Sequence, residues 1–322
     1  MRQLVGHTKD VRAVAFLPDG RVVSGGSDRT VRLWDPASGE CVRTVRARTP
    51  VYAVAVSPDG SEVAYAGRHP GVDAGEVPIR TFVLADCVPG GTVFGGTFRF
   101  PYRTPPQGFA GSYPNGFPRS VWSLSYSADG RALAAAGRVM GGGNIPNGGG
   151  GHWFHAHAQF AHGPLATESA YALRFAPDGE RLAVTGDRVV EFYASPEHPE
   201  PVVAYPLQSQ WAAAVAYLPG SSQAVVGVNS ALYFVDATTR TKPRRVKTGF
   251  RTITAVDAAA DGRAVFVGGK PGGVEVYDPE GGTLRVRYDF GLGGVHAVAV
   301  APDGVTFAVA GDDGLALFDR DG

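Results

Sequence analysis

Four of the eight histidines lie within eleven residues of one another, and imidazole is a common ligand for divalent metals. They are His152, His155, His157 and His162, in the segment GHWFHAHAQFAH. On a β-strand, residues two apart point to the same face, so such a pair could hold one ion together. This segment is the first candidate for metal chemistry.

Other patterns that could support catalysis are weaker. The glycine-rich stretch Gly141–Gly151 lacks the Gly-Lys-Ser/Thr of a phosphate-binding loop and opens no helix, which favours a flexible loop. No Gly-x-Ser-x-Gly elbow occurs, and neither Cys41 nor Cys87 has a histidine nearby in a recognisable arrangement. Two isolated cysteines are also too few for a disulfide framework. We therefore expect no catalytic residues, no resident metal and no cofactor.

Composition narrows the class of protein. The 322 residues include 45 Gly and 24 Pro, which is typical of a turn-rich globular chain. Lys+Arg and Asp+Glu are 30 each, so a general polyanion binder is not favoured and nucleic acid is an unlikely partner. No apolar run approaches the roughly 18 residues that cross a bilayer. Few cysteines, no apolar signal core and an Arg-rich basic set predict a cytoplasmic, bacterial protein with no membrane partner.

An alternating apolar segment that ends in a Pro-Asp-Gly-like turn, followed by a second apolar segment, occurs seven times. The copies span 11–26, 51–67, 121–137, 170–186, 212–227, 253–269 and 295–311. Alternation with period two predicts strands, and the turn residues suit a tight reversal, so each copy is expected to be a β-hairpin. A third strand should follow at 30–35, 189–193, 232–236, 274–278 and 315–319, and a more polar fourth strand at segments such as 41–47.

The first copy carries a further motif. It reads Gly6-His7, then Ser24-Gly25-Gly26-Ser27-Asp28, then Val31-Arg32-Leu33-Trp34-Asp35, and this resembles a complete WD repeat. The other six copies are similar but degenerate. The resemblance implies a hydrogen-bonded tetrad of His7, Ser24, Asp28 and Trp34. Elsewhere the tryptophan is replaced by Tyr193, Phe234, Tyr277 or Phe318, so packing should matter more in those blades.

The repeat period supports an all-β, seven-bladed propeller of four-stranded antiparallel blades in a single domain, 1–322. Most turns lie 40 to 42 residues apart. The expected blades are roughly 6–47, 48–100, 119–165, 168–206, 210–247, 250–289 and 293–319 plus 1–5. The N-terminal residues would supply the missing fourth strand of the last blade and close the ring, which removes an exposed edge.

Three insertions interrupt the period: 68–78, 101–118 and 138–151. In propellers of the resembled family these connections emerge on the top face, opposite the Asp-Gly turns. Insertions on a repeat scaffold tend to lie on the binding face. We therefore expect a binding surface over blades 2 and 3.

One position near the start of each innermost strand is large or polar. Counting back seven residues from each turn Asp or its equivalent gives Arg12, Tyr52, Trp122, Tyr171, Ala213, Thr254 and His296. In similar propellers this ring faces the mouth of the central channel, where partner peptides dock. Trp and Tyr are frequent binding anchors, so Tyr52, Trp122 and Tyr171 are predicted to bind a partner. The alternative is that these aromatic side chains simply plug the channel.

The expected strand positions also place the histidine segment and a basic segment. Trp153 precedes Tyr171 by the same 18 residues that separate Trp34 from Tyr52, which predicts that Trp153 ends the third strand of blade 3. His155 and His157 would then fall in a solvated turn.

Residues 240–251 carry six positive charges and are expected to be a solvated outer strand, with an acidic partner or nucleic acid as the alternative.

These patterns favour a non-enzymatic scaffold for a protein or peptide, with its site on the top face over blades 2 to 4. Tyr52, Trp122 and Tyr171 would be apolar anchors, and Arg12 and His296 would supply polar contacts. Two alternatives stay open. One is a propeller enzyme or a protein that binds a small molecule or metal under a lid of insertions. The other is a structural subunit of a larger assembly.

Overall fold

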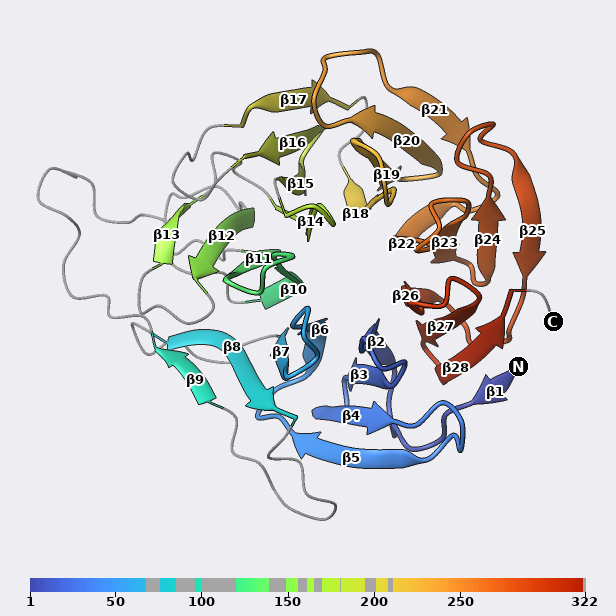
Figure 1. Cartoon of the computed structure of the whole chain (residues 1–322). Coiled ribbons are helices and arrows are strands. Elements are labelled where there is room, and N and C mark those ends of the chain that lie inside the picture. The colour runs from blue at the N-terminus through green and yellow to red at the C-terminus, as the bar shows by residue number, and fades with distance from the viewer. Residues whose placement is uncertain are drawn as a thin grey trace, which may run out of the picture.

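The computed structural model describes residues 1–67, 76–84, 96–99, 120–138, 149–155, 161–164, 170–179, 181–194, 201–207 and 211–320. Within these ranges every regular element is a β-strand, and no helix suited to crossing a membrane is found there. The described strands form seven four-stranded antiparallel sheets, which stand around a common axis (Figure 1). The prediction of an all-β chain built from four-stranded antiparallel sheets is confirmed.

Strands follow one another in chain order from the axis outward in the first six sheets. Sheet 1 comprises β2 (Val11–Phe16), β3 (Val22–Gly26), β4 (Thr30–Trp34) and β5 (Cys41–Arg46). Sheet 2 comprises β6 (Val51–Val56), β7 (Glu62–Gly67), β8 (Glu76–Val83) and β9 (Gly96–Arg99). Sheet 3 comprises β10 (Ser120–Tyr126), β11 (Ala132–Arg138), β12 (Gly149–His155) and β13 (Ala161–Pro164). Sheets 4 to 6 comprise β14 (Ala172–Phe175), β15 (Leu182–Gly186), β16 (Val189–Tyr193) and β17 (Val203–Pro206); β18 (Ala212–Tyr217), β19 (Gln223–Val228), β20 (Ala231–Asp236) and β21 (Arg244–Lys247); and β22 (Thr252–Ala258), β23 (Val265–Lys270), β24 (Val274–Tyr277) and β25 (Leu284–Tyr288).

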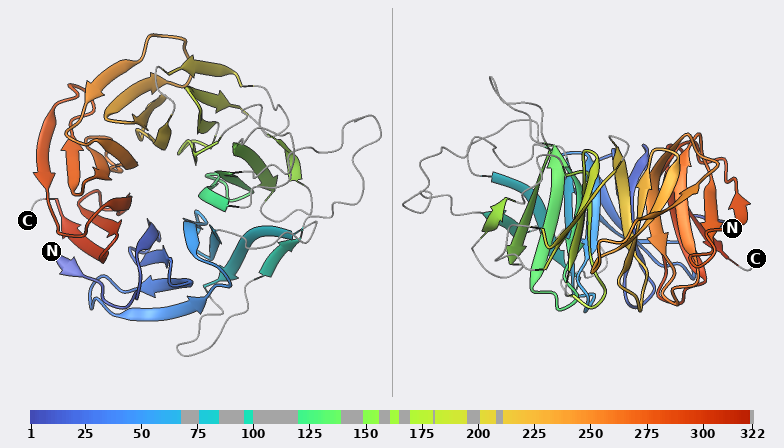
Figure 2. Two further views of the ribbon diagram at one scale, coloured as in Figure 1. Left: turned by 180° about the vertical axis from the view of Figure 1, so that it is seen from behind. Right: turned by 90° about the horizontal axis from the view of Figure 1, so that it is seen from above.

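Sheet 7 combines the two ends of the chain. It contains β26 (Val295–Val300), β27 (Thr306–Gly311), β28 (Gly314–Asp319) and β1 (Arg2–Gln3), and β1 pairs with β28 at its outer edge. The Leu4 amide continues the pairing by donating to the Leu315 carbonyl at 2.9 Å, and the Leu4 side chain is buried. Both views in Figure 2 place the N- and C-termini near each other beside this sheet.

The hairpin turns follow from their residues. In sheet 1 the Gly20 amide donates to Leu17 O at 3.0 Å, and the Arg21 amide donates to Asp19 Oδ1 at 3.0 Å. Gly20 has a φ of 87°, a conformation that side chains with a Cβ rarely adopt. The aspartate therefore bonds its own turn while the glycine makes the reversal possible.

The core lies between neighbouring sheets rather than at the axis. Each apolar cluster joins residues of adjacent sheets, as where Trp34 of sheet 1 packs with Leu317 of sheet 7. All five residues of β3 are buried. At Gly25 an added Cβ would lie 2.4 Å from Val51 of the next sheet, so glycine is required there for close approach. The sheets are thus held together mainly by burial of apolar side chains.

Strand register corrects two sequence assignments. Trp34 pairs with Val22 in sheet 1. Leu133 holds the position of Val22 in sheet 3, and it pairs with Phe154, whereas Trp153 pairs with Ala134. Phe154 is therefore the equivalent of Trp34. In sheet 5 the corresponding residue is Val235 and not Phe234. A shift of one residue moves a side chain to the opposite face of the sheet, so Phe234 packs toward sheet 6 and Val235 toward sheet 4.

The expected insertions are only partly described. Residues 76–78 belong to β8 and residues 149–151 belong to β12, so the first and third insertions are shorter than predicted. His155 is the last residue of β12 rather than part of the following turn. The remainder of 68–78, the whole of 101–118, and residues 139–148 lie outside the described residues.

Candidate functional site

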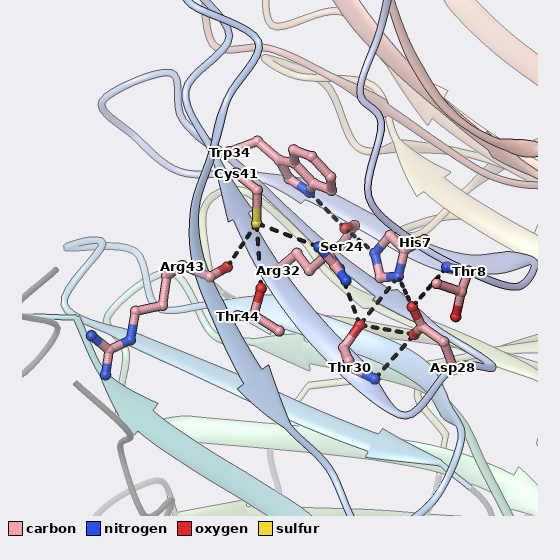
Figure 3. A network of polar contacts seen from close by, with 10 residues as sticks. All are labelled: His7, Thr8, Ser24, Asp28, Thr30, Arg32, Trp34, Cys41, Arg43 and Thr44. Carbon is pink, nitrogen blue, oxygen red and sulfur yellow. Dashed lines mark hydrogen bonds and ion pairs between the residues drawn. The ribbon is translucent and has the colours of Figure 1, made fainter. Parts of the chain in front are cut away.

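The four residues of the expected tetrad form one hydrogen-bonded chain in sheet 1 (Figure 3). Trp34 Nε1 donates to Ser24 Oγ at 2.8 Å, Ser24 Oγ lies 2.7 Å from His7 Nε2, and His7 Nδ1 lies 2.9 Å from Asp28 Oδ2. A carboxylate only accepts, so His7 donates from Nδ1 and accepts the Ser24 hydroxyl proton at Nε2. The chain therefore links the segment before β2 to strands β3 and β4 and to the turn between them.

Burial sets the charge state of this network. Burial lowers the pKa of His7 below its usual 6.5, and this outweighs the opposite effect of Asp28. Burial tends to raise the pKa of Asp28, but hydrogen bonds from Thr30 and His7 hold it below its usual value. At neutral pH the pair is thus a neutral imidazole and a carboxylate. These hydrogen bonds hold the segment before β2 against β3, β4 and their turn in sheet 1.

The seven residues counted back from the turns all line one axial cavity of about 1170 Å³. They are Arg12, Tyr52, Trp122, Tyr171, Ala213, Thr254 and His296, and we call them the mouth ring because they lie at the end opposite the Asp-Gly turns. The residue before each of them is at most 1% exposed. The mouth-ring residues themselves are partly exposed, Trp122 the most at 36%.

A backbone irregularity explains why this position differs from its neighbours. In six sheets the pairing of the innermost strand skips the mouth-ring residue, as at Arg12 between Val11 and Ala13. In sheet 4 the Tyr171 amide bonds to Thr185 O, and Thr185 also faces Ala172. Two residues opposite one form a β-bulge, which re-aims a side chain. The bulge turns each mouth-ring residue toward the cavity.

Aromatic rings from three consecutive sheets stack at the mouth. Trp122 and Tyr171 have ring centroids 6.0 Å apart with planes at 13°, and Tyr171 and Trp211 have centroids 5.8 Å apart with planes at 8°. Trp122 is 36% exposed and Trp211 is 61% exposed. The Tyr171 hydroxyl donates to Asp187 Oδ1 at 2.6 Å, which fixes the central ring. We call these three residues the aromatic ladder. Tyr52 lines the same cavity.

Trp211 is the site residue that the repeat pattern misses. The mouth-ring position of sheet 5 is Ala213, and the tryptophan stands two residues earlier, just before β18. Its side chain fills the place left by the small alanine and continues the ladder. The available signal was a tryptophan that occupies no third-strand position in an otherwise alanine-rich segment.

Charged residues occupy the other side of the mouth. Arg12 forms an ion pair with Asp10, and His296 Nε2 lies 2.7 Å from Asp312 Oδ1. Burial and the nearby Arg12 guanidinium lower the pKa of His296 below 6.5. Possible ligand atoms of Asp10, His296 and Asp312 lie within 4.8 Å of one another. The Arg12 cation on Asp10 opposes a metal ion here, so we assign the cluster to an Arg12–Asp10 ion pair in sheet 1 and a hydrogen bond between neutral His296 and Asp312 in sheet 7.

A second ion pair crosses the cavity deeper down. Arg174 Nη2 of sheet 4 lies 2.9 Å from Asp257 Oδ1 of sheet 6, and Asp257 Oδ2 accepts the Val300 amide at 2.9 Å. The same strand position in the other five sheets holds Ala15, Ala55, Ser125, Ala216 and Ala299. These small side chains leave room for one Arg–Asp bridge across the axis.

The histidine segment is only partly described. His152 lies in β12, and Trp153 of that strand pairs with His162 of β13. The side chains of His152, His155 and His162, and the whole of His157, lie outside the described residues. The metal alternative based on them stays a prediction.

Comparison with known proteins identifies the first repeat. Residues 1–35 match the model described as "WD domain, G-beta repeat", which confirms the resemblance of this segment to WD repeats. An uncharacterised WD repeat-containing protein of Synechocystis is 49% identical over 63 residues, 18% of each chain. A ribosome biogenesis protein BOP1 homologue of Drosophila grimshawi is 44% identical over 55 residues, 17% of this chain and 7% of the relative.

A third relative, protein Mut11 of Chlamydomonas reinhardtii, is 60% identical over 42 residues, 13% of this chain and 11% of the relative. The matches thus span less than a fifth of these relatives. The first of these relatives is named as a WD repeat-containing protein and the second as a ribosome biogenesis protein. The relatives come from bacterial and eukaryotic sources, so a bacterial origin and a cytoplasmic location stay predictions.

Proposed function

We propose that this chain, which begins with a WD repeat, is a closed seven-bladed propeller and a non-enzymatic scaffold that binds a protein or peptide at its mouth. The binding surface comprises Tyr52 and the aromatic ladder on one side and Arg12 and His296 on the other. The expected surface over blades 2 to 4 is thereby extended to blade 5. The single observation that carries the proposal is the exposed aromatic ladder.

The ladder is costly unless something covers it. Trp and Tyr bury large areas in interfaces and are enriched among residues that dominate binding energy. Here Trp122 and Trp211 keep 36% and 61% of their surfaces exposed. A partner that covers both rings would gain this apolar area.

The cavity argues against the alternative that the aromatic residues plug the channel. The cavity of about 1170 Å³ extends from the mouth ring to the hairpin turns, and the ion pair of Arg174 with Asp257 lies within it. Trp122 and Trp211 keep exposed surface beside this cavity, so a partner can reach both rings. The Arg12 cation and the His296 imidazole can offer polar contacts around them, as rims of interfaces do.

WD-repeat relatives support a scaffold role in a general way. One relative is named as a ribosome biogenesis protein, and that role is the relative's own. For the present chain we propose an assembly partner of unknown identity. We also propose that residues 1–322 form a single domain.

Affinity purification from the native host, followed by mass spectrometry, tests the proposal. The Trp122→Ala/Trp211→Ala variant should lose the partner by at least about tenfold, because anchor truncations cost 2 kcal/mol or more. Leu284→Ala is a matched control, since Leu284 is 51% exposed on an outer strand. The recovered partner is then titrated in purified form. Equal affinity for wild type and the double variant would overturn the proposal.

A further inference from the structure

Positive charge is concentrated on the outer strand of sheet 5 and its flanks. Five exposed cations follow one another from the turn before β21 to the residue that precedes β22: Arg240, Lys242, Arg245, Lys247 and Arg251. Among the residues that the structure describes, none of these five side chains is in an ion pair. On the neighbouring outer strand β25, by contrast, Arg285 pairs with Asp278 and Arg287 pairs with Glu275.

The strand itself ends the sheet. The order of sheet 5 is β18-β19-β20-β21, and β21 lies on the outer rim (Figures 1 and 2). The Thr248 amide donates to Ser230 O at 2.9 Å, and Lys247 is paired with Ala231. In an antiparallel ladder, alternate residues direct their main chain to the partner strand. Arg244 and Val246 therefore face β20, and Arg245 and Lys247 direct their N–H and C=O groups outward.

The same two residues thus supply an open main-chain edge and exposed cationic side chains. The side chain of their neighbour Arg244 instead makes contacts within the molecule. Its guanidinium lies 4.0 Å from the centre of the Phe234 ring and donates to the Pro279 carbonyl. These contacts hold β21 against sheets 5 and 6, so the edge is presented by an anchored strand.

We propose that β21 is a docking edge for an acidic, extended peptide segment of a partner protein, which adds to sheet 5 as a fifth strand. Residues two apart on a strand are spaced by roughly 6.6 to 6.8 Å, so carboxylates at alternate peptide positions match Arg245 and Lys247. Main-chain hydrogen bonds supply affinity and the charges select the sequence, as in strand addition generally. This site is separate from the mouth and does not depend on it.

The observations favour a peptide over a nucleic acid. Single-stranded nucleic acids need aromatic platforms between basic residues, and the five cations are not interleaved with exposed rings. The whole chain has no net positive charge to support polyanion binding. Lysine and arginine on an edge strand repel basic strands and lose hydration when an uncharged strand covers them, which is compatible with selection of an acidic one.

Fluorescence anisotropy with the full chain tests this docking edge. The probe is a labelled ten-residue peptide of alternating Glu and Thr. Arg245→Glu/Lys247→Glu should weaken its binding by at least about tenfold, because it places like charges opposite the ligand. Arg46→Glu, on the outer strand β5, should leave binding unchanged. The Trp122→Ala variant should also bind the probe normally.

Two further probes separate strand addition from charge alone. A peptide with the same charges but N-methylated on its five central residues cannot donate main-chain hydrogen bonds and should bind at least about tenfold more weakly. Equal binding of this peptide would overturn the proposal, as would tighter binding of a single-stranded DNA of equal charge. Equal loss in Arg46→Glu would overturn it too. If the double reversal unfolds the chain, Arg245→Gln/Lys247→Gln serves instead, with a weakening of at least about threefold expected.

Discussion

His7 acts in sheet 1 as a neutral relay between a hydroxyl and a carboxylate. The residues that stand opposite the innermost strand at the position of Ser24 in the other sheets are apolar or aromatic: Tyr65, Ala135, Val184, Val226, Val267 and Val309. Without this hydroxyl the same relay cannot form in those sheets. Among the described residues, this hydrogen-bonded tetrad is therefore specific to sheet 1.

The charge state of His7 predicts a pH dependence. Unfolded His7 takes up a proton near pH 6.5, while folded His7 does so at lower pH, because burial disfavours its charged form. The contribution of His7 to stability is thus complete above pH 6.5 and declines as the pH falls through 6.5. His296, whose pKa is also lowered, acts in the same direction.

Chemical denaturation at several pH values should show a smaller decline for His7→Gln than for wild type on going from neutral to acidic pH. His296→Gln measures the share of the second histidine. NMR titration of the His7 ring gives its pKa directly, and a value at or above 6.5 would contradict the assignment.

At the scale of the strand, sheet 6 shows how a degenerate repeat replaces the tetrad. Glu275 of β24 is fully buried and accepts the Tyr277 hydroxyl at 2.7 Å and the Gly249 amide at 3.0 Å. Arg287 Nη1 lies 3.3 Å from its other oxygen. Burial and the adjacent carboxylate raise the pKa of Tyr277. A carboxylate thus joins β24, β25 and the segment before β22.

Glu275→Ala should destabilise the chain by about 3 kcal/mol, because it leaves the buried Tyr277 hydroxyl and the partly buried Gly249 amide without an acceptor. Glu280→Ala, at an exposed position in the following turn, should change stability by less than about 0.5 kcal/mol. Urea unfolding monitored by tryptophan fluorescence measures both variants. Comparable small effects for the two would show that packing alone holds this sheet.

At the scale of the molecule, the two ends of the chain meet in one sheet. β1 covers the outer edge of β28, and Leu4 is 2% exposed against sheet 7, while Val5 beside it is 79% exposed. Strand edges left unpaired favour association with other chains. The N-terminal residues thus contribute to the outer edge of the last sheet and to its core.

Leu4→Ala should lower the free energy of unfolding by about 2 to 4 kcal/mol, since it leaves a cavity in this core. Val5→Ala is the adjacent control and should change it by less than about 0.5 kcal/mol. Thermal unfolding and light scattering measure stability and association. Equal midpoints for the two variants would show that the N-terminal strand does not support the molecule.

The sequence alone predicted the seven hairpins with their turns, five of the third strands and the grouping in fours, because period-two alternation and Pro-Asp-Gly turns are local signals. It also located the mouth ring, since a large or polar residue between buried ones repeats at a fixed distance from each turn. Local signals did not determine register, so Trp153 and Phe234 were placed one residue from the true equivalents of Trp34.

Tertiary structure decided what depends on residues that are distant in the chain. Trp211 joins the aromatic ladder only because sheets 3, 4 and 5 converge at the axis, and Arg174 reaches Asp257 across 83 residues for the same reason. The open edge of β21 likewise follows from sheet order and hydrogen-bond parity. Side-chain contacts between separate strands are set by the packing of the whole ring, and a repeat pattern read along the chain carries no record of them.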